Sequence, residues 1–267
     1  MLKDFVILGV VDMPSDCSID IKFEDADCVN ATRHENDNVT INTNLVELAG
    51  VVAGDVVKIL ARGSSNELSL CYFYLKTMIV FHDEKLGIDR TRTEHHKIIS
   101  FGKGASFVAK NIKKGMPVSL KGEIRTNKWR NCNGQPRIHR DIRLNSVSIL
   151  TKHENLNKAT IVGEVVSPPS VISLESKFVS LLIKTSIPKK FSHGDLHELD
   201  FKNEIHKVVA FNDVSEYLFI NVKKGDLLHV EGEIVSSFWT EKSSGEKRKA
   251  QEIMASVVRL PAINQQV

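Results

Sequence analysis

Residues 121–143, here called the first hairpin, combine an aromatic side chain with many cations. Trp129 lies among seven basic residues, and the stretch has two acidic ones, Glu123 and Asp141, which gives a net charge of about +5. The basic residues are Lys121, Arg125, Lys128, Arg130, Arg137, Arg140 and Arg143. Cations bind phosphate groups, and an exposed ring can stack on a base. This combination predicts a surface that binds a nucleic acid strand.

Residues 231–253, the second hairpin, contain the aromatic pair Phe238 and Trp239 but lack the positive charge. Four basic residues, including Lys247, stand against five acidic ones, a net charge of about −1. We therefore expect Trp129 to contribute more binding free energy than Trp239. Packing in a module–module or subunit contact is the alternative role for Trp239.

The two hairpins belong to a repeat. Residues 94–150 and 204–260 match without a gap, 110 positions apart, and share a His, a Phe, Lys-Lys-Gly, Gly-Glu-Ile and a Trp. A repeat of this length indicates a duplicated domain rather than a solenoid. We predict an acidic β extension over 1–50, a first module over 51–152, a second module over 153–262 and a tail over 263–267.

Each module is expected to be mainly β with one short helix. The last strand before the helix is predicted over 97–101 and 207–211, and the helix over 105–112 and 214–221. The next strands, 118–124 and 228–234, contain an internal Gly that predicts a bulge. The two hairpins follow, and their return strands are predicted over 142–150 and 253–260. Two strands should precede these elements, at 55–62 and 68–81 in the first module and at 159–166 and 178–185 in the second. This order is that of an OB-fold, a five-stranded Greek-key barrel.

The motifs in this order resemble the bacterial single-stranded-DNA-binding protein family. The resemblance implies OB-fold barrels, binding of single-stranded DNA, no catalysis and aromatic side chains that stack on bases. Phe101 and Phe211 match the family's stacking Phe, and Trp129 and Trp239 match its hairpin Trp. The family has another Trp just before the shared His, where this sequence has His95 in the first module and Ile205 in the second.

Other functional classes find little support in the sequence. The four Cys residues form no CxxC pair, and no phosphate loop, HExxH or GxSxG motif occurs. We therefore expect no enzyme activity, no cofactor and no metal, and a structural role for His96 and His206. The N-terminus lacks the apolar core of a signal peptide, and no segment is apolar enough to span a membrane, so a cytoplasmic protein is expected.

Several alternatives stay open at this stage. Single-stranded RNA could replace DNA, or both barrels could serve assembly alone. The extension over 1–50 is expected to pack on the first barrel or to contact a partner protein, and 5–11 could instead be that barrel's first strand. The C-terminus lacks the family's acidic tail, which favours a specialised protein, for instance of a mobile element. Two barrels per chain imply a homodimer if the family's count of four holds, with a monomer as the alternative.

Overall fold

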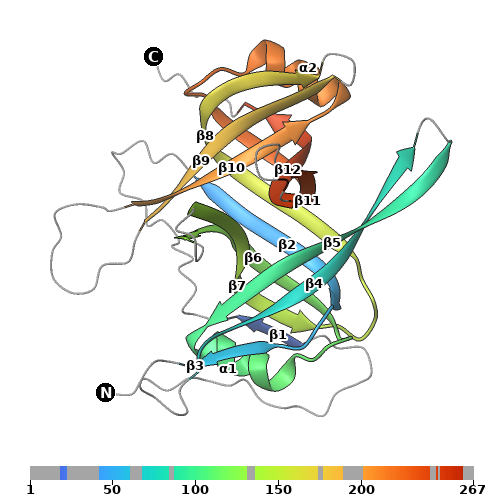
Figure 1. The fold of residues 1–267 in the computed structure, drawn as a ribbon, viewed down its shortest axis with the longest axis vertical. Helices are drawn as coiled ribbons and strands as arrows, with labels where there is room; N and C mark the ends of the chain where they lie inside the picture. Colours follow the sequence, from blue (N-terminus) through green and yellow to red (C-terminus); the bar gives the residue numbers. More distant parts are fainter. Residues whose placement is uncertain are drawn as a thin grey trace, which may run out of the picture.

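Two β-barrels lie one above the other along the long axis of the molecule (Figure 1). The computed structural model describes residues 19–22, 42–60, 68–83, 87–130, 136–173, 177–188, 201–240, 245 and 247–260. Barrel 1 contains β2 (Thr43–Val52), β3 (Val57–Leu60), β4 (Leu68–Asp83), β5 (Ile88–Phe101), α1 (Gly102–Asn111), β6 (Pro117–Arg130) and β7 (Pro136–Ile149). Barrel 2 contains β8 (Leu156–Ser173), β9 (Phe178–Pro188), β10 (Phe201–Ala210), α2 (Asn212–Asn221), β11 (Leu227–Thr240) and β12 (Lys247–Arg259).

Both barrels close in the same way, as predicted for tandem OB-folds. The sheet of barrel 1 closes where β5 pairs in parallel with β7, at Ile98 opposite Ile142. Barrel 2 closes where β10 pairs in parallel with β12, at Val208 opposite Ile253. Neither helix of the described ranges has the length and apolar character that a membrane span requires.

The first strand of barrel 1 starts earlier than predicted. It is β2, which pairs with β4 and β6 as β8 pairs with β9 and β11, so a boundary at residue 50 cuts through it. Val46 and Leu48 of β2 are fully buried. Of the stretch predicted over 55–62, the part that the structure describes forms the short, exposed β3. A strand is required at β2 because its apolar side chains fill one wall of the core.

Part of the predicted extension does contact barrel 1. Strand β1 (Ile19–Lys22) pairs antiparallel with β7, placing Ile19 opposite Ile149. The alternative first strand at 5–11 lies outside the described residues, as does the tail over 263–267.

The predicted bulges occur at both internal glycines. The pairing register shifts between Lys121 and Gly122 and again between Glu231 and Gly232. A Cβ atom on Gly122 would lie 2.4 Å from the carbonyl oxygen of Arg143, so a side chain does not fit. Each bulge bends its strand sharply, which helps a five-stranded sheet to close.

The Lys-Lys-Gly segments follow the helices but do not cap them. The helices end at Asn111 and Asn221, and Gly115 and Gly225 lie in the turns that follow, with φ of +86° and +94°. The Gly115 N–H donates to the carbonyl of Val52 (2.9 Å). Glycine is favoured here because the left-handed backbone lets this turn return to the first strand.

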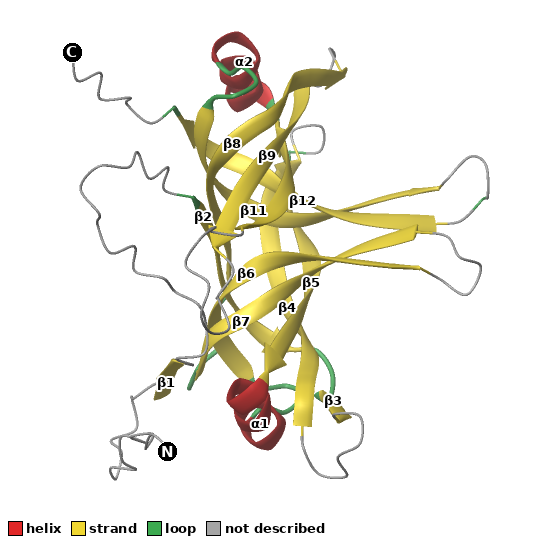
Figure 2. Ribbon diagram, turned by 90° about the vertical axis from the view of Figure 1, so that its left-hand side faces the viewer, coloured by secondary structure: helices red, strands yellow, loops and turns green. Residues whose placement is uncertain are grey.

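The two barrels share one continuous sheet. Strand β2 pairs antiparallel with β8 from Thr43 opposite Val162 to Ala49 opposite Leu156. Residues 150–155 connect β7 of barrel 1 to β8 of barrel 2. Figure 2 shows the β6–β7 and β11–β12 hairpins projecting from the same side of the molecule.

Candidate nucleic-acid interface

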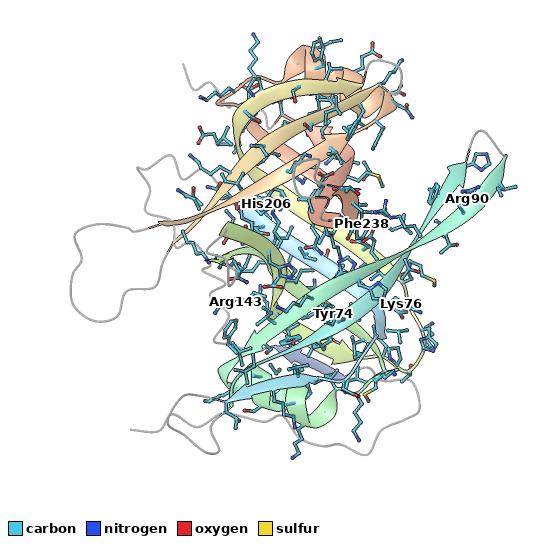
Figure 3. The ribbon with its side chains drawn as sticks, viewed as in Figure 1. Tyr74, Lys76, Arg90, Arg143, His206 and Phe238 are labelled. Carbon is cyan, nitrogen blue, oxygen red and sulfur yellow. The ribbon has the colours of Figure 1, made fainter. Side chains whose placement is uncertain are left out.

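One outer face of barrel 1 carries aromatic and basic side chains in register. Strands β4 and β5 pair Leu70 with Phe101, Tyr72 with Ile99, Tyr74 with Lys97 and Lys76 with His95. Arg143 of β7 joins this face because it lies opposite Ile99. We call the following set the aromatic face of barrel 1: Tyr72, Tyr74, Lys76, His95, Lys97, Phe101 and Arg143. Figure 3 labels Tyr74, Lys76 and Arg143 of this set.

Cations lie over two of these rings. The Lys97 ammonium is 4.7 Å from the centroid of the Tyr72 ring, and the Arg143 guanidinium carbon is 5.5 Å from that of Phe101. Tyr74 meets Tyr72 edge to face, with centroids 6.1 Å apart. Phe101 and Tyr74 are 47% and 43% exposed, so both rings are accessible to a base. Ring and cation together match a stacked base and its phosphate.

Local backbone geometry explains why these rings face outward. Successive residues of a strand point to opposite faces, so the fully buried Phe73 and Leu75 direct Tyr72 and Tyr74 to the surface. Phe101 ends β5 and is the N-cap of α1, with φ of −121° and ψ of 161°. Its extended backbone keeps its ring at the mouth of the barrel rather than in the core.

The equivalent face of barrel 2 has lost most of these features. Ser180 and Leu182 of β9 occupy the positions of Tyr72 and Tyr74, as the pairing with β10 shows. Phe211 is stacked on Phe178, with ring centroids 4.6 Å apart and planes within 7°. The cation Lys207 is paired with Glu252 (2.7 Å), as its counterpart Lys97 is with Asp141 (3.5 Å). The main difference is therefore that this face offers fewer free rings to a strand.

Three cations of the first hairpin are already engaged within the protein. Lys121 is 2.8 Å from the carboxylate of Glu47. The Arg125 side chain is 12% exposed and lies 2.6 Å from Glu123. Arg140 is partly buried against barrel 2, where it donates to the main-chain carbonyls of Gln251 (3.4 Å) and Ile205 (3.5 Å). Counting the charged residues in the hairpin sequence therefore overstates the positive potential that the hairpin presents to a nucleic acid.

Acidic residues of the second hairpin are engaged as well. Glu231 lies 2.7 Å from Lys158, and Glu252 lies 2.7 Å from Lys207. These ion pairs neutralise two of the five carboxylates that gave the hairpin its negative count. Lys249, a cation of the same hairpin, has an exposed side chain. The two hairpins differ less in available charge than their sequences indicate.

Comparison with known proteins identifies the family. The sequence model of the single-strand binding protein family matches residues 43–150 and 156–261, one match to each barrel. The chain belongs to the single-strand binding protein family. Both matches start at the first barrel strands, β2 and β8.

Individual relatives agree with this assignment. Single-stranded DNA-binding protein 1 of Xylella fastidiosa is 28% identical over 106 residues, which cover 40% of this chain and 77% of that protein. Its namesake from Chlorobaculum tepidum is 27% identical over 107 residues, 39% of this chain and 64% of the relative. The wild-type single-stranded DNA binding protein from Thermus aquaticus has the same tandem fold, with a TM-score of 0.62, 17% identity and coverage of 82% of this chain and 93% of that one.

The binding residues predicted from the sequence fall into three groups. Phe101, Arg143 and His95 lie together on the aromatic face of barrel 1, whereas Phe211 lies on barrel 2 and Phe238 on its hairpin. Lys121, Arg125 and Arg140 make the contacts given above. For the remaining residues the structure describes the strand backbone but not the side chains: Lys128, Trp129, Arg130, Arg137, Trp239 and Lys247.

Tyr72, Tyr74 and Lys97 were missed on the sequence. The run Tyr72-Phe73-Tyr74 contains the signal, because a strand that buries Phe73 must expose both tyrosines. Lys97 follows His96, which the repeat shares, and it reaches the Tyr72 ring because β5 pairs with β4.

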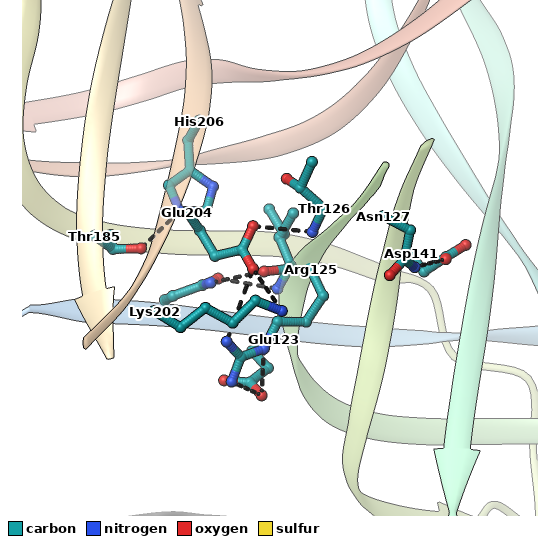
Figure 4. Close-up of polar contacts among 11 residues, drawn as sticks. Glu123, Arg125, Thr126, Asn127, Asp141, Thr185, Lys202, Glu204 and His206 are labelled. Atoms are coloured by element: carbon teal, nitrogen blue, oxygen red, sulfur yellow. Dashed lines mark hydrogen bonds and ion pairs between the residues drawn. The ribbon is translucent and has the colours of Figure 1, made fainter. Parts of the chain in front are cut away.

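Buried polar contacts join the two barrels reciprocally, and Figure 4 shows those around Glu204. The main-chain N–H of Thr126 in barrel 1 donates to Glu204 in barrel 2 (2.9 Å), and that of Ser236 in barrel 2 donates to Glu94 in barrel 1 (3.1 Å). Glu94 and Glu204 are 3% and 1% exposed. Arg125 adds a cation 3.8 Å from Glu204. These two contacts hold the β6–β7 and β11–β12 hairpins in fixed positions across the boundary between the barrels.

His96 and His206 have equivalent structural positions. Both rings are buried, and their Nε2 atoms share hydrogen bonds with the Thr77 (2.8 Å) and Thr185 (2.9 Å) hydroxyls. Burial lowers the pKa of each imidazole to about 4, and in His96 the nearby Lys249 adds to the effect. Among the described residues no cluster of three or more His, Cys, Asp and Glu side chains could hold a metal ion.

These two histidines predict an acid-sensitive fold. Between their unfolded pKa near 6.5 and folded pKa of about 4, the unfolded chain binds more protons. Stability should therefore fall as the pH decreases through this window, by up to ~3 kcal/mol per histidine. Urea unfolding at several pH values measures the slope. The double variant His96→Gln, His206→Gln should flatten it, and an unchanged slope would assign the effect to other groups.

Proposed function

We propose that this protein binds single-stranded DNA with little sequence preference, mainly through the aromatic face of barrel 1. The observation that carries the proposal is the pair of accessible rings, Tyr74 and Phe101. The Arg143 cation lies over the Phe101 ring, and the Lys97 cation lies over Tyr72, the neighbour of Tyr74. Membership of the single-strand binding protein family supports it, as do the names of the relatives.

Stacking explains both expected properties of the binding. Every base has a π-face, so an aromatic ring accepts any sequence, and lysine and arginine contact phosphates that all nucleotides share. In a duplex the bases are stacked on each other and are not available to these rings. Such a protein would protect or organise single strands exposed in replication, recombination or DNA transfer, including transfer of a mobile element. The proposed role is binding without catalysis.

A titration tests the proposal. We expect fluorescence anisotropy with labelled oligo(dT), oligo(rU) and a duplex of equal length to give the tightest binding for oligo(dT) at moderate salt. The logarithm of the binding constant should fall with the logarithm of salt concentration by ~0.7 per phosphate contact. Equal affinity for duplex and single strand would contradict the proposal, tighter binding of oligo(rU) would favour RNA, and no binding would favour an assembly role.

We also propose a homodimer, which the resemblance to proteins with four cooperating barrels supports. Light scattering should give about twice the chain mass of 29.9 kDa. The measurement should be made with and without oligonucleotide, since a strand could link two monomers. A single-chain mass under both conditions would contradict the dimer.

A further inference from the structure

We propose that the second hairpin, although part of barrel 2, completes the binding face of barrel 1, with Phe238 and Lys249 as its contacts to the strand. The inference rests on the proposed function and adds to it a path that crosses between barrels. Phe238 and Lys249 lie opposite each other on β11 and β12. Phe238 is 71% exposed.

Hydrogen bonds anchor the second hairpin to barrel 1. The Ser236 N–H of β11 donates to the buried Glu94 carboxylate of β5 (3.1 Å), and the Arg92 guanidinium donates to the carbonyl of Ser236. Glu94 directly precedes His95, which belongs to the aromatic face of barrel 1. The hairpin therefore leaves barrel 2 and meets barrel 1 beside that face.

Phe238 follows the anchor point by two residues. Alternation along β11 places its side chain on the same face of the strand as that of Ser236, whose main-chain N–H and carbonyl point from the edge of β11 toward β5. Figure 3 shows Phe238 between barrel 2 and the β4–β5 hairpin, with Tyr74 and Lys76 on the strand below it. An exposed ring in this position can stack on a base of a DNA strand that continues beyond Tyr74.

Lys249 supplies a cation at the same place. Its ammonium lies 5.7 Å from the centroid of the Phe238 ring. After burial, its charge is the largest influence that lowers the pKa of His96, a residue of barrel 1, which agrees with a position close to β5. Phe238 and Lys249 therefore repeat the ring-and-cation pairs of Tyr72 with Lys97 and Phe101 with Arg143.

The first hairpin provides a matched comparison. Its equivalent cross-strand pair is Lys128 opposite Ile138, so the second hairpin alone has an aromatic residue at this described position. Ile138 is an exposed apolar residue, at 61%. Ile138→Ala thus removes a similar surface group from the hairpin that crosses toward barrel 2.

Short oligonucleotides separate the composite face from two independent sites. An OB-fold occupies ~4–16 nucleotides, so oligo(dT) of about 8–10 nucleotides covers one face. We expect Phe238→Ala to weaken this complex about 5- to 150-fold, as for loss of one stacked base. Lys249→Ala should weaken it and reduce the salt slope by ~0.7. Ile138→Ala should leave the affinity unchanged, and thermal melting should confirm that all three variants fold.

Photocrosslinking supplies a second readout. A short oligonucleotide with one 4-thiothymidine, moved along the sequence, should crosslink to peptides from both β4–β5 and β11. If the oligonucleotide crosslinks to β11 and otherwise only to β9 or β10, the inference is overturned and Phe238 belongs to the face of barrel 2. If the unmodified protein binds no oligo(dT), the proposed function fails; if it binds and Phe238→Ala behaves like Ile138→Ala, only the composite face fails.

Discussion

Replacing Tyr74 and Phe101 together by alanine should nearly abolish binding of short single strands. Each ring stacks on a separate base in the proposed complex, and loss of a stacked base costs ~1–3 kcal/mol, so the double variant should lose about 2–6 kcal/mol. This corresponds to a dissociation constant that is at least about 30-fold higher. Anisotropy titration with oligo(dT) measures the change. Both rings are more than two-fifths exposed, so the fold should tolerate the substitutions.

The equivalent positions of barrel 2 provide the control. Leu182 and Phe211 occupy the places of Tyr74 and Phe101, but Phe211 already stacks on Phe178. Leu182→Ala with Phe211→Ala should therefore change the affinity for a short oligonucleotide much less. A larger loss in this control than in the barrel 1 variant would move the main site to barrel 2.

The repeat made the second half of each barrel predictable. The glycine bulges and the hairpins could be placed because two copies of each motif agree in spacing. The first strand of barrel 1 was missed because the front halves do not share that spacing. Asn44 and Asn157 make the same paired hydrogen bonds, with Ile124 and Ile234, yet they are not 110 residues apart. These three-dimensional contacts show that β2 and β8 are equivalent.

The binding surface was predicted less completely than the fold. Charge counting within a hairpin assumes that its side chains face solvent, but Arg125 and Arg140 contact barrel 2 instead. Their partners are distant in sequence, and no local pattern encodes them. Tyr72 and Tyr74 were predictable in principle, since their strand alternates clearly. Their value as a platform depends on Lys97 and Phe101 of the neighbouring strand.

The largest loss of folding stability is expected from removing the two carboxylates that join the barrels. Glu204 accepts a hydrogen bond from the Thr126 N–H, and Glu94 accepts one from the Ser236 N–H; both carboxylates are buried. Removing one member of a buried charged pair leaves its partners desolvated and unpaired, at a cost of ~3–5 kcal/mol. Glu94→Ala and Glu204→Ala should each lower the free energy of unfolding by about this amount.

Two comparisons identify the cause of the loss. Glu204→Gln keeps an acceptor for Thr126 but removes the charge near Arg125, so its loss should be smaller than that of Glu204→Ala. Glu216→Ala removes an exposed ion pair with Lys177, 61% exposed on both sides, and should cost only ~0–1 kcal/mol. Urea unfolding followed by circular dichroism measures all four variants. If Glu94→Ala and Glu204→Ala were as stable as Glu216→Ala, the barrels would be held together by the β2–β8 pairing and core packing, and the hairpins would not depend on these carboxylates.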